Sequence, residues 1–506
     1  MGWAAVAEKR PLARNGLANV LQALAGAALL FALYRYINAT LGVEQLGVWS
    51  VVLATASASR LADLGLSAGV TRFVARDRAR GEVERAGQVI DTAVLTLMVA
   101  VGVVLPLLYP LIAWLLPRLF DGAHLGRAME ILPYALMSLW LTIVGAVFQG
   151  GLDGCQRMDL RAGLVVSGQA LLLALAIWLV PRFGLVGLAW AQIGQGLFLA
   201  VAGRWLLRRA LPALPRLPRK WSRPVLREML GYGANVQVAT VFMLLLDPVA
   251  KALMARFGGP AAAGFFEMAN QVVLKVRALI VSANQAIVPH VAALAEAEPA
   301  RLTRLYRDNL RLLVFVTLPV FALLIAWAGG FSWLLLGGYQ PEFVFLITLL
   351  AVAWGANIFA GPAHFTNLGT GHVGWNTLSH VLMGTLNAGL GWLLGSRYGA
   401  HGVAFGYAIA LIAGSAMLIG AYGYRHRVHH RERCHAGLTH GHLSLIGASL
   451  AVAIFGWLLP LRKESDEPAL ALISLLLPPL VLGVSVWCHP VRRQLIESLW
   501  ARKVRI

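Results

Sequence analysis

The chain has 506 residues, of which 58% are hydrophobic and only 13% are charged, and its mean hydropathy is +0.70. A soluble protein of this length needs far more polar surface, so the composition excludes that class and indicates a polytopic membrane protein. The net charge is +20, which in a soluble protein would suggest a nucleic-acid partner.

Residues 1–15 are basic, and no small-residue cleavage site follows the first apolar run. We therefore expect an uncleaved first span rather than a signal peptide. A membrane span needs about 20 apolar residues. The predicted fold is an all-α polytopic membrane protein with about fourteen transmembrane helices, at 16–39, 47–74, 88–116, 130–152, 162–180, 185–207, 229–255, 262–291, 309–336, 343–366, 374–395, 401–424, 443–460 and 468–488.

Lysine and arginine are distributed unevenly between the two sides of these spans. With the N-terminus inside, the inner connections carry 29 of the 43 basic residues and the outer connections carry 7. This asymmetry predicts a protein of the bacterial inner membrane with both termini in the cytoplasm. It also accounts for the basic charge without any nucleic acid.

The connections divide the chain into six predicted parts. The longest inner connection is rich in Pro and Arg and is expected to lie on anionic lipid headgroups. The predicted parts are a six-helix N-terminal lobe (1–207), a basic cytoplasmic linker (208–228), a six-helix C-terminal lobe (229–424), a His/Arg-rich cytoplasmic loop (425–442), a helix pair (443–488) and an amphipathic cytoplasmic tail (489–506).

Glycines recur at equivalent places in the two lobes. Gly42 and Gly47 match Gly259 and Gly264 at an offset of 217 residues. "FQGGLDG" and "FTNLGTG" match at the same offset through Phe148 with Phe365 and Gly154 with Gly371. "FGLVGLAW" and "YGAHGVAF" match at 215. A parallel repeat of six spans predicts lobes related by a pseudo-two-fold axis along the membrane normal, with a substrate cavity between them.

Basic residues inside the predicted spans follow the same repeat. Arg60 and Arg277 are 217 residues apart, and each lies 13 residues past its matched glycine, near the middle of the bilayer. Arg35 and Lys251 form a looser pair, at 216. Each cation would cost about 2.5–3.5 kcal/mol if it faced lipid, so we predict that they line a watery cleft and bind an anionic substrate. Lys275 is a further candidate, but it points away from the direction of Arg277.

Acidic residues in the spans are candidates for ion coupling or for pairing with these bases. They are Asp63, Asp91, Asp247 and Glu267. The alternative for the whole set is structural ion pairing between helices, with Arg60 beside Asp63 and Lys251 beside Asp247. Arg72 and Arg204 are expected to snorkel to the inner interface. No metal site is predicted, because neither the three cysteines nor the histidines of 425–442 show a metal-ligand spacing.

Three stretches together resemble a known family: "LGVEQLGVW…LADLGLSAGVTRFVA", "LLDPVAKALMARFGGPAAAGFFEMANQVV" and "FGLVGLAWAQ". They are similar to the polysaccharide-transport and O-antigen flippase branch of the multidrug/oligosaccharidyl-lipid/polysaccharide exporter superfamily, over roughly residues 10–425. The resemblance implies a two-lobe helical transporter with alternating access. Asp247 matches an acidic position of that family, but Pro248 stands where the family usually has a basic residue.

The function that this resemblance implies is transport rather than enzymatic catalysis. An undecaprenyl-diphosphate-linked oligosaccharide, such as an O-antigen or exopolysaccharide unit, would move from the cytoplasmic to the periplasmic leaflet. The alternatives are a drug or cation exporter of the same superfamily, and a membrane O-antigen polymerase or ligase. No cofactor is expected, and the sequence leaves open whether Na⁺ or H⁺ drives transport. We expect a monomer, with polysaccharide-assembly proteins as candidate partners.

Overall fold

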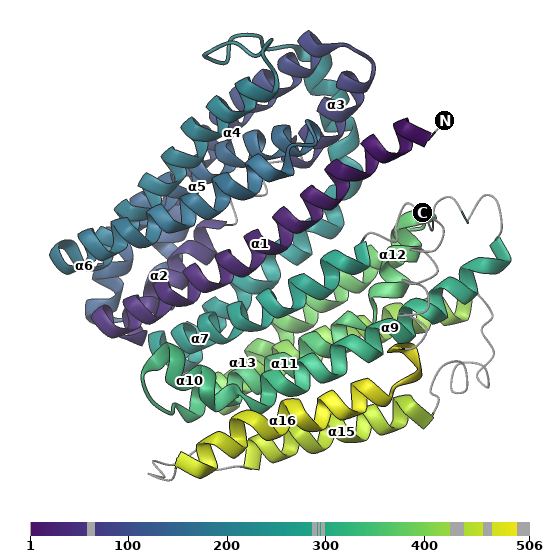
Figure 1. The fold of residues 1–506 in the computed structure, drawn as a ribbon. Coiled ribbons are helices and arrows are strands. Elements are labelled where there is room, and N and C mark those ends of the chain that lie inside the picture. Colours follow the sequence, from purple (N-terminus) through teal and green to yellow (C-terminus); the bar gives the residue numbers. More distant parts are fainter. Residues whose placement is uncertain are drawn as a thin grey trace. The chain divides into compact units, whose positions relative to one another are not determined.

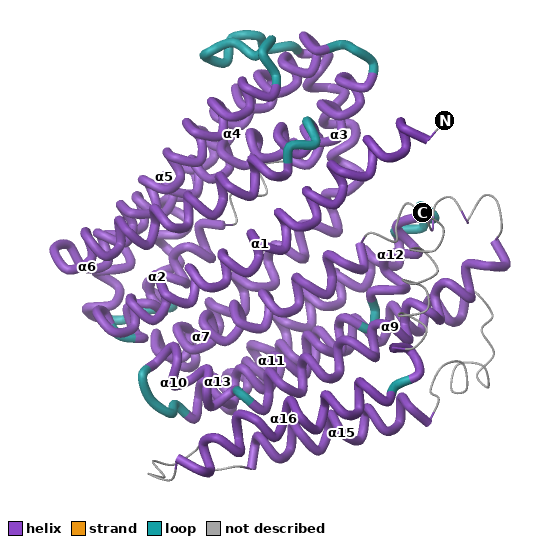
Figure 2. Tube along the Cα trace, in the orientation of Figure 1, coloured by secondary structure: helices purple, strands orange, loops and turns teal. Residues whose placement is uncertain are grey.

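The protein is described here from a computed structural model that covers all but a few segments of the chain (Figure 1). The segments outside the description are residue 1 and 58–65, 286–290, 292–293, 295–298, 426–439, 459–467 and 493–506. In the part that is described, all regular secondary structure is helical (Figure 2). The helices group into two compact units, residues 1–264 and 265–506.

The first unit contains the helices from the N-terminus to the break in α7. They are α1 (Gly2–Leu41), α2 (Val43–Ala56), α3 (Leu66–Ala79), α4 (Val83–Leu115), the 3₁₀ turn η2 (Leu116–Arg118), α5 (Gly122–Gly154), α6 (Met158–Ala210) and the first part of α7 (Arg223–Gln285). Helices α5 and α6 pack extensively on each other, and α6 also packs on α1.

The second unit contains the rest of α7 and the helices that follow it. They are α9 (Pro299–Ala326), α10 (Ala328–Leu336), α11 (Pro341–Ile358), α12 (Gly361–Gly369), α13 (Gly374–Arg425), α15 (His440–Leu458) and α16 (Pro468–Cys488). Within it α15 packs on α9 and α16, and α11 packs on α13.

All fourteen predicted spans are helical over their described residues, although their ends differ from the prediction. The span predicted at 309–336 breaks at Trp327, between α9 and α10. The span at 343–366 breaks after Ile358, and Pro362 stands in the first turn of α12 rather than kinking a continuous helix. Proline is tolerated there because a first-turn residue has no intrahelical acceptor for its N–H.

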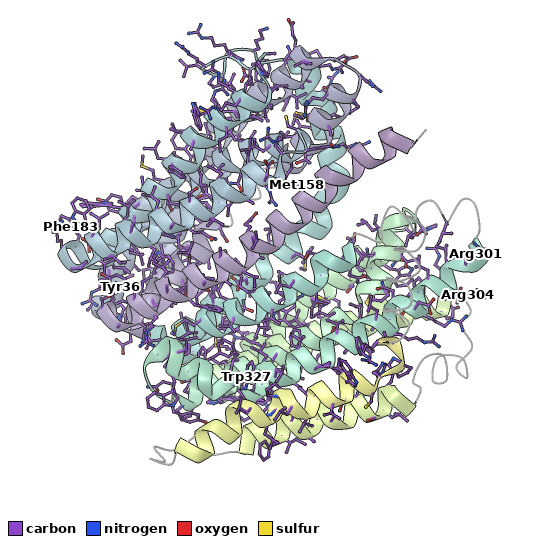
Figure 3. The ribbon with its side chains drawn as sticks, viewed as in Figure 1. Tyr36, Met158, Phe183, Arg301, Arg304 and Trp327 are labelled. Carbon is purple, nitrogen blue, oxygen red and sulfur yellow. The ribbon has the colours of Figure 1, made fainter. Side chains whose placement is uncertain are left out.

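The molecule is a multi-pass membrane protein, and its helices show this directly. Within the described residues, seven helical segments are long and apolar enough to cross a membrane, and three more apolar helices are shorter. Helix α4 buries Leu97 and Val101 but exposes Val99, Val103 and Leu107. An exposed apolar face of this kind suits contact with acyl chains. In Figure 3, Arg301 and Arg304 lie at one end of α9 and Trp327 at the other, as expected for a basic inner end.

Four glycines interrupt the helices at equivalent places in the repeat. Gly42 and Gly259 both have φ near +80° with an extended ψ. Gly184 and Gly399 share a second conformation, with φ of 57° and 60° and ψ of −133° and −143°. These backbone regions are essentially restricted to glycine. The structure therefore confirms the predicted equivalence of Gly42 with Gly259 and supports the 215-residue match in the later pair of segments.

The predicted match around Gly154 is wrong by two residues. Cys155 and Thr370 donate their backbone N–H groups four residues back, to Gly151 and Thr366, at 2.9 Å each. The next residue in each turn, Gln156 or Gly371, has a positive φ. The two turns are thus the same structure at an offset of 215, and Gly154 does not correspond to Gly371, nor Phe148 to Phe365.

A reciprocal backbone contact joins α2 to the segment of α7 that follows Gly259. A Cβ atom on Gly47 would lie 1.8 Å from the Pro260 carbonyl oxygen, and one on Gly264 would lie 2.3 Å from the Val43 carbonyl oxygen. Pro260 and Val43 are themselves 217 residues apart, so the contact is symmetric. Neither glycine could carry a side chain without moving the backbone.

The basic linker packs within the first unit. Arg204 of α6 donates to the carbonyl oxygens of Pro215 and Arg216, at 2.8 and 2.9 Å. Trp221 donates its indole N–H to Thr96 of α4, at 3.1 Å. The predicted lobe limits at 207 and 229 stay a prediction. The His/Arg-rich loop and the amphipathic tail lie almost entirely outside the described residues.

We predict that Gly399→Ala destabilises the protein, because alanine strains the backbone conformation that breaks α13. The expected cost is about 1–3 kcal/mol. Gly389→Ala, in the same helix, is the matched control, since a Cβ atom at either position would meet no neighbour within 4 Å. Thermal unfolding of the two variants in detergent measures the difference, and equal midpoints would contradict the prediction.

Candidate functional site

The predicted symmetric pair of arginines is only half described. Arg60 and its neighbour Asp63 fall within 58–65, outside the described residues. Arg277 lies in the second unit, on the last part of α7, and is partly buried. The structure thus tests the environment of Arg277 but leaves its pairing with Arg60 a prediction.

Arg277 is held by neutral groups. Its Nη2 donates to Oδ1 of Asn357 on α11 at 3.0 Å, and Asn357 in turn donates to the Ser415 hydroxyl of α13 at 2.9 Å. The guanidinium also lies 4.5 Å from the centroid of the Trp354 ring. Trp354 is fixed by its own bond to Asn270, at 3.2 Å. Three helices therefore orient this cation through an amide and an aromatic face.

Arg277 has no carboxylate partner within the part of the chain that the structure describes. Its buried Nε is also without a hydrogen-bond acceptor there. A structural ion pair, the alternative weighed from the sequence, would have placed an acid against it. The arrangement instead leaves the positive charge available to an anion, for which a guanidinium is a strong ligand. Lys275, two residues earlier, is likewise partly buried.

Lys251 and Asp247 form the ion pair that their spacing predicts. The Lys251 ammonium is 2.6 Å from Asp247 Oδ2, and only 7% of the Lys251 side chain is exposed. Arg35, its looser counterpart in the repeat, is exposed on α1. The two positions therefore differ in environment. Glu267 is buried and accepts a hydrogen bond from Gln271 at 3.1 Å.

The prediction for Arg204 is wrong. This arginine does not snorkel: it is buried, and both of its terminal nitrogens contact Asp91 Oδ1 at 3.2 Å. The other carboxylate oxygen of Asp91 accepts backbone N–H groups from Arg219 and Lys220, at 3.1 and 3.4 Å. Both oxygens are thus engaged by the protein, which makes Asp91 an anchor for the linker and a poor candidate for ion coupling.

An ionic cluster at the end of α3 was not predicted from the sequence. Arg76 bonds to Asp77 and to Glu228 of α7, and Arg85 of α4 contacts Glu228 at 3.1 Å. Arg76 holds the pKa of the Glu228 carboxyl below its usual range, chiefly through its hydrogen bond. The cluster ties the start of α7 to the connection between α3 and α4.

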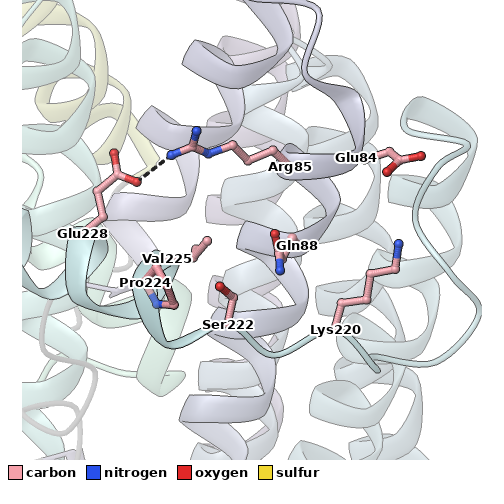
Figure 4. A pocket seen from close by; sticks show the side chains of 8 residues that line it. All are labelled: Glu84, Arg85, Gln88, Lys220, Ser222, Pro224, Val225 and Glu228. Atoms are coloured by element: carbon pink, nitrogen blue, oxygen red, sulfur yellow. Dashed lines mark hydrogen bonds and ion pairs between the residues drawn. The ribbon is translucent and has the colours of Figure 1, made fainter.

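Beside this cluster lies a pocket of about 520 Å³ (Figure 4). Arg85 and Glu228 lie on one side of it, with Glu84, Gln88, Lys220 and Ser222 around the rest. The sequence offered no signal for it, since its groups come from α4, the linker and α7, which are distant in the chain.

Two histidines near Arg277 were also missed. His364 of α12 and His380 of α13 have ring centroids 5.8 Å apart. Ionisable residues within a predicted span are functional candidates by default. Counting histidine together with the fully charged residues would have found them.

The sequence and the fold can now be compared with known proteins. The polysaccharide biosynthesis protein family matches residues 40–339, more than half of the chain. The chain belongs to that family. No curated protein matches the sequence.

Solved structures show that this polysaccharide biosynthesis protein has the fold of the MOP superfamily. The lipid II flippase MurJ, in an inward closed conformation, is similar with a TM-score of 0.71 at 12% identity, over 97% of this chain and 99% of that one. An inward-facing multidrug resistance MATE family transporter gives 0.68 at 17% identity, over 78% and 93%. A mutant of the Vibrio cholerae MATE transporter VcmN gives 0.58 at 17%, over 83% and 98%. These neighbours are transporters, and their low identity establishes the fold alone.

We predict that Arg204→Ala releases the linker of this family member. The change leaves the buried Asp91 carboxylate without its cationic partner, at a cost of about 3–5 kcal/mol. Thermal unfolding and protease cleavage within 208–228 are the measurements. Arg209→Ala is the control, because Arg209 is exposed on the same helix and stacks on Trp205. Unchanged cleavage in Arg204→Ala would refute the anchoring role.

We also predict a pH dependence for the ion pairs of Glu228. Because its pKa is lowered in the folded protein, its stabilising contribution is complete above the usual carboxyl range, near pH 4, and is lost as the pH falls below it. The stability difference between wild type and Glu228→Gln should be constant from pH 6 to 8 and shrink in acid. Glu84→Gln, at an exposed position of the same pocket, should show no such difference.

Proposed function

We propose that this membrane protein is a flippase for an undecaprenyl-diphosphate-linked oligosaccharide, which it moves from the cytoplasmic to the periplasmic leaflet. The observation that carries the proposal is the environment of Arg277, a membrane-embedded guanidinium with neutral partners within the described residues. Family membership supports a role in polysaccharide synthesis. A diphosphate linked to a lipid is an anion that must cross the membrane and that arginine binds well.

Fourteen transmembrane helices and a pseudo-two-fold axis along the membrane normal are part of the proposal. The similarity to MurJ extends over 97% of the chain and that to the MATE structures over 78–83%, which favours a membrane-embedded α15 and α16. The reciprocal contact of Gly47 and Gly264 has the symmetry that such an axis would impose. The substrate would pass by alternating access through a cationic cavity between the lobes.

The proposed orientation is that of an inner-membrane protein with both termini in the cytoplasm. Basic and aromatic side chains at the ends of helices support it. Arg209 stacks on the exposed Trp205 at 3.7 Å near the end of α6, and the exposed Trp221 follows in the linker. Such pairs are typical of the interface with anionic lipid headgroups.

Export of a cationic drug is the second candidate, because MATE structures share the fold. A cation site needs an available acid. Asp247 pairs with Lys251, and Asp91 is engaged by Arg204 and by backbone N–H groups. The acids that the structure describes within the spans of the first unit therefore favour an anionic substrate. A polymerase or ligase is less well supported, because the similar structures are transporters.

We predict that Arg277→Ala abolishes transport while the protein still reaches the membrane. Arg277→Lys should retain a fraction of it, since an ammonium keeps the charge but lacks the planar fork that binds phosphate at two points. The measurement is flipping of a fluorescent short-chain prenyl-diphosphate oligosaccharide in proteoliposomes, read out with a membrane-impermeant quencher.

Arg256→Ala is the matched control, because Arg256 is an exposed arginine on the same helix. A reduction of at least about tenfold in Arg277→Ala, with wild-type rates in Arg256→Ala, is expected for the loss of a charge-assisted bond worth about 1.5–3 kcal/mol. Wild-type flipping by Arg277→Ala would refute the proposal.

A further inference from the structure

Arg277 does not stand alone in the second unit. His364 and His380 are partly buried, their rings are inclined at 48°, and each lies close enough to Arg277 to feel its charge. His364 is on α12, a short helix, and its carbonyl oxygen accepts a bond from Asn376 of α13 at 3.0 Å. Three nitrogen bases thus converge from α7, α12 and α13.

The elements around the two imidazoles supply few other titratable groups. Helix α11 contributes Asn357 and Trp354 to the surroundings of Arg277. Helix α13 contributes Tyr407 near Arg277, as well as Tyr422, which stacks on Tyr306 of α9 beside α12. From α7 the charged group is Arg277 itself. The groups named are bases and phenols, and none of them is a carboxylic acid.

Two buried nitrogen atoms of the cluster lack hydrogen-bond partners among the described residues. They are Nε of Arg277 and Nδ1 of His380. A buried polar atom left unsatisfied costs about 1–3 kcal/mol, so such atoms are rare outside functional sites. An oxyanion would satisfy the Arg277 donor directly and the histidine once it carries a proton.

We propose that His364 and His380 complete an oxyanion site around Arg277, and that this site takes up a proton from water when a diphosphate binds. The proposal deepens the flippase function and rests on it. In the empty site, charging an imidazole would bring a second cation beside Arg277 in a poorly solvated place, so both rings stay neutral. A bound diphosphate reverses that balance, since its negative charge favours an imidazolium that donates a hydrogen bond to it.

Proton uptake makes the affinity for the anion depend on pH. If one proton binds with each anion, the dissociation constant falls about tenfold for each unit by which the pH falls. The proton comes from the aqueous phase and adds one positive charge to the site, and no other group needs to change. Substrate would then bind more tightly on the more acidic side of the membrane.

The test uses the purified full chain and two probes whose charge is constant from pH 6 to 8: a diphosphate diester joining a short prenyl chain to N-acetylglucosamine, and sulfate. Calorimetric titrations in two buffers of different ionisation enthalpy count the protons taken up. For the wild type we expect about one proton per diester and roughly tenfold tighter binding per pH unit below pH 8. Sulfate binding should show the same sign of pH dependence.

The double variant His364→Gln/His380→Gln should bind the diester with less than about a twofold change from pH 6 to pH 8 and with no proton uptake. His364→Gln alone is a second variant, with an intermediate slope expected. His372→Gln is the matched control, because His372 is exposed in the turn between α12 and α13 and should keep the wild-type slope. Elution as a single species from size-exclusion chromatography confirms that each variant is folded.

The outcomes separate this proposal from the flippase function. Wild-type binding that does not change with pH, or an unaltered slope in the double variant, overturns the histidine site and leaves the role of Arg277 standing. Wild type that binds neither probe at pH 6, together with wild-type flipping by Arg277→Ala, overturns both.

Discussion

The structure depends on one constraint: inside hydrocarbon, every backbone N–H and C=O group must find its partner within the protein. Helices meet it over most of the chain. Where the chain reverses between two helices, a residue must leave the helical conformation without leaving its neighbours unpaired. Gly42, Gly184, Gly259 and Gly399 do this with backbone conformations that other residues rarely adopt. Because the constraint is the same in both halves of the chain, the solution recurs with it.

The same scarcity of water governs the charged side chains, and the protein treats them in different ways. Lys251 is neutralised by an acid one helical turn away, and Arg204 by Asp91 together with two carbonyl oxygens. Arg277 instead receives an amide and an aromatic face. An ion pair would hold the helices together equally well but would cancel the charge. Neutral partners fix the position of the guanidinium and preserve its field, which is what a binding site requires.

Sequence patterns predicted the parts of this structure that follow from local chemistry. The spans could be placed from hydropathy alone, and the glycines at 42 and 259 from their shared context. The two-residue shift in register before Gly371 could not, because glycine is so common here that a false match looks as good as the true one. Arg204 was misjudged because its partner, Asp91, is 113 residues away. His364 and His380 were overlooked because their significance depends on a fold that brings them to Arg277.

The cluster around Arg277 also shows how the protein reconciles binding with folding. Unsatisfied nitrogen atoms on Arg277 and His380 cost stability, so the surroundings must hold them in place against collapse or rotation. The bonds from Asn357 to Ser415 and from Trp354 to Asn270 supply that rigidity from residues that need not touch the substrate. A site built in this way is stabilised when an anion arrives, because the ligand removes the cost that folding left. Affinity and incomplete satisfaction are therefore two aspects of the same arrangement.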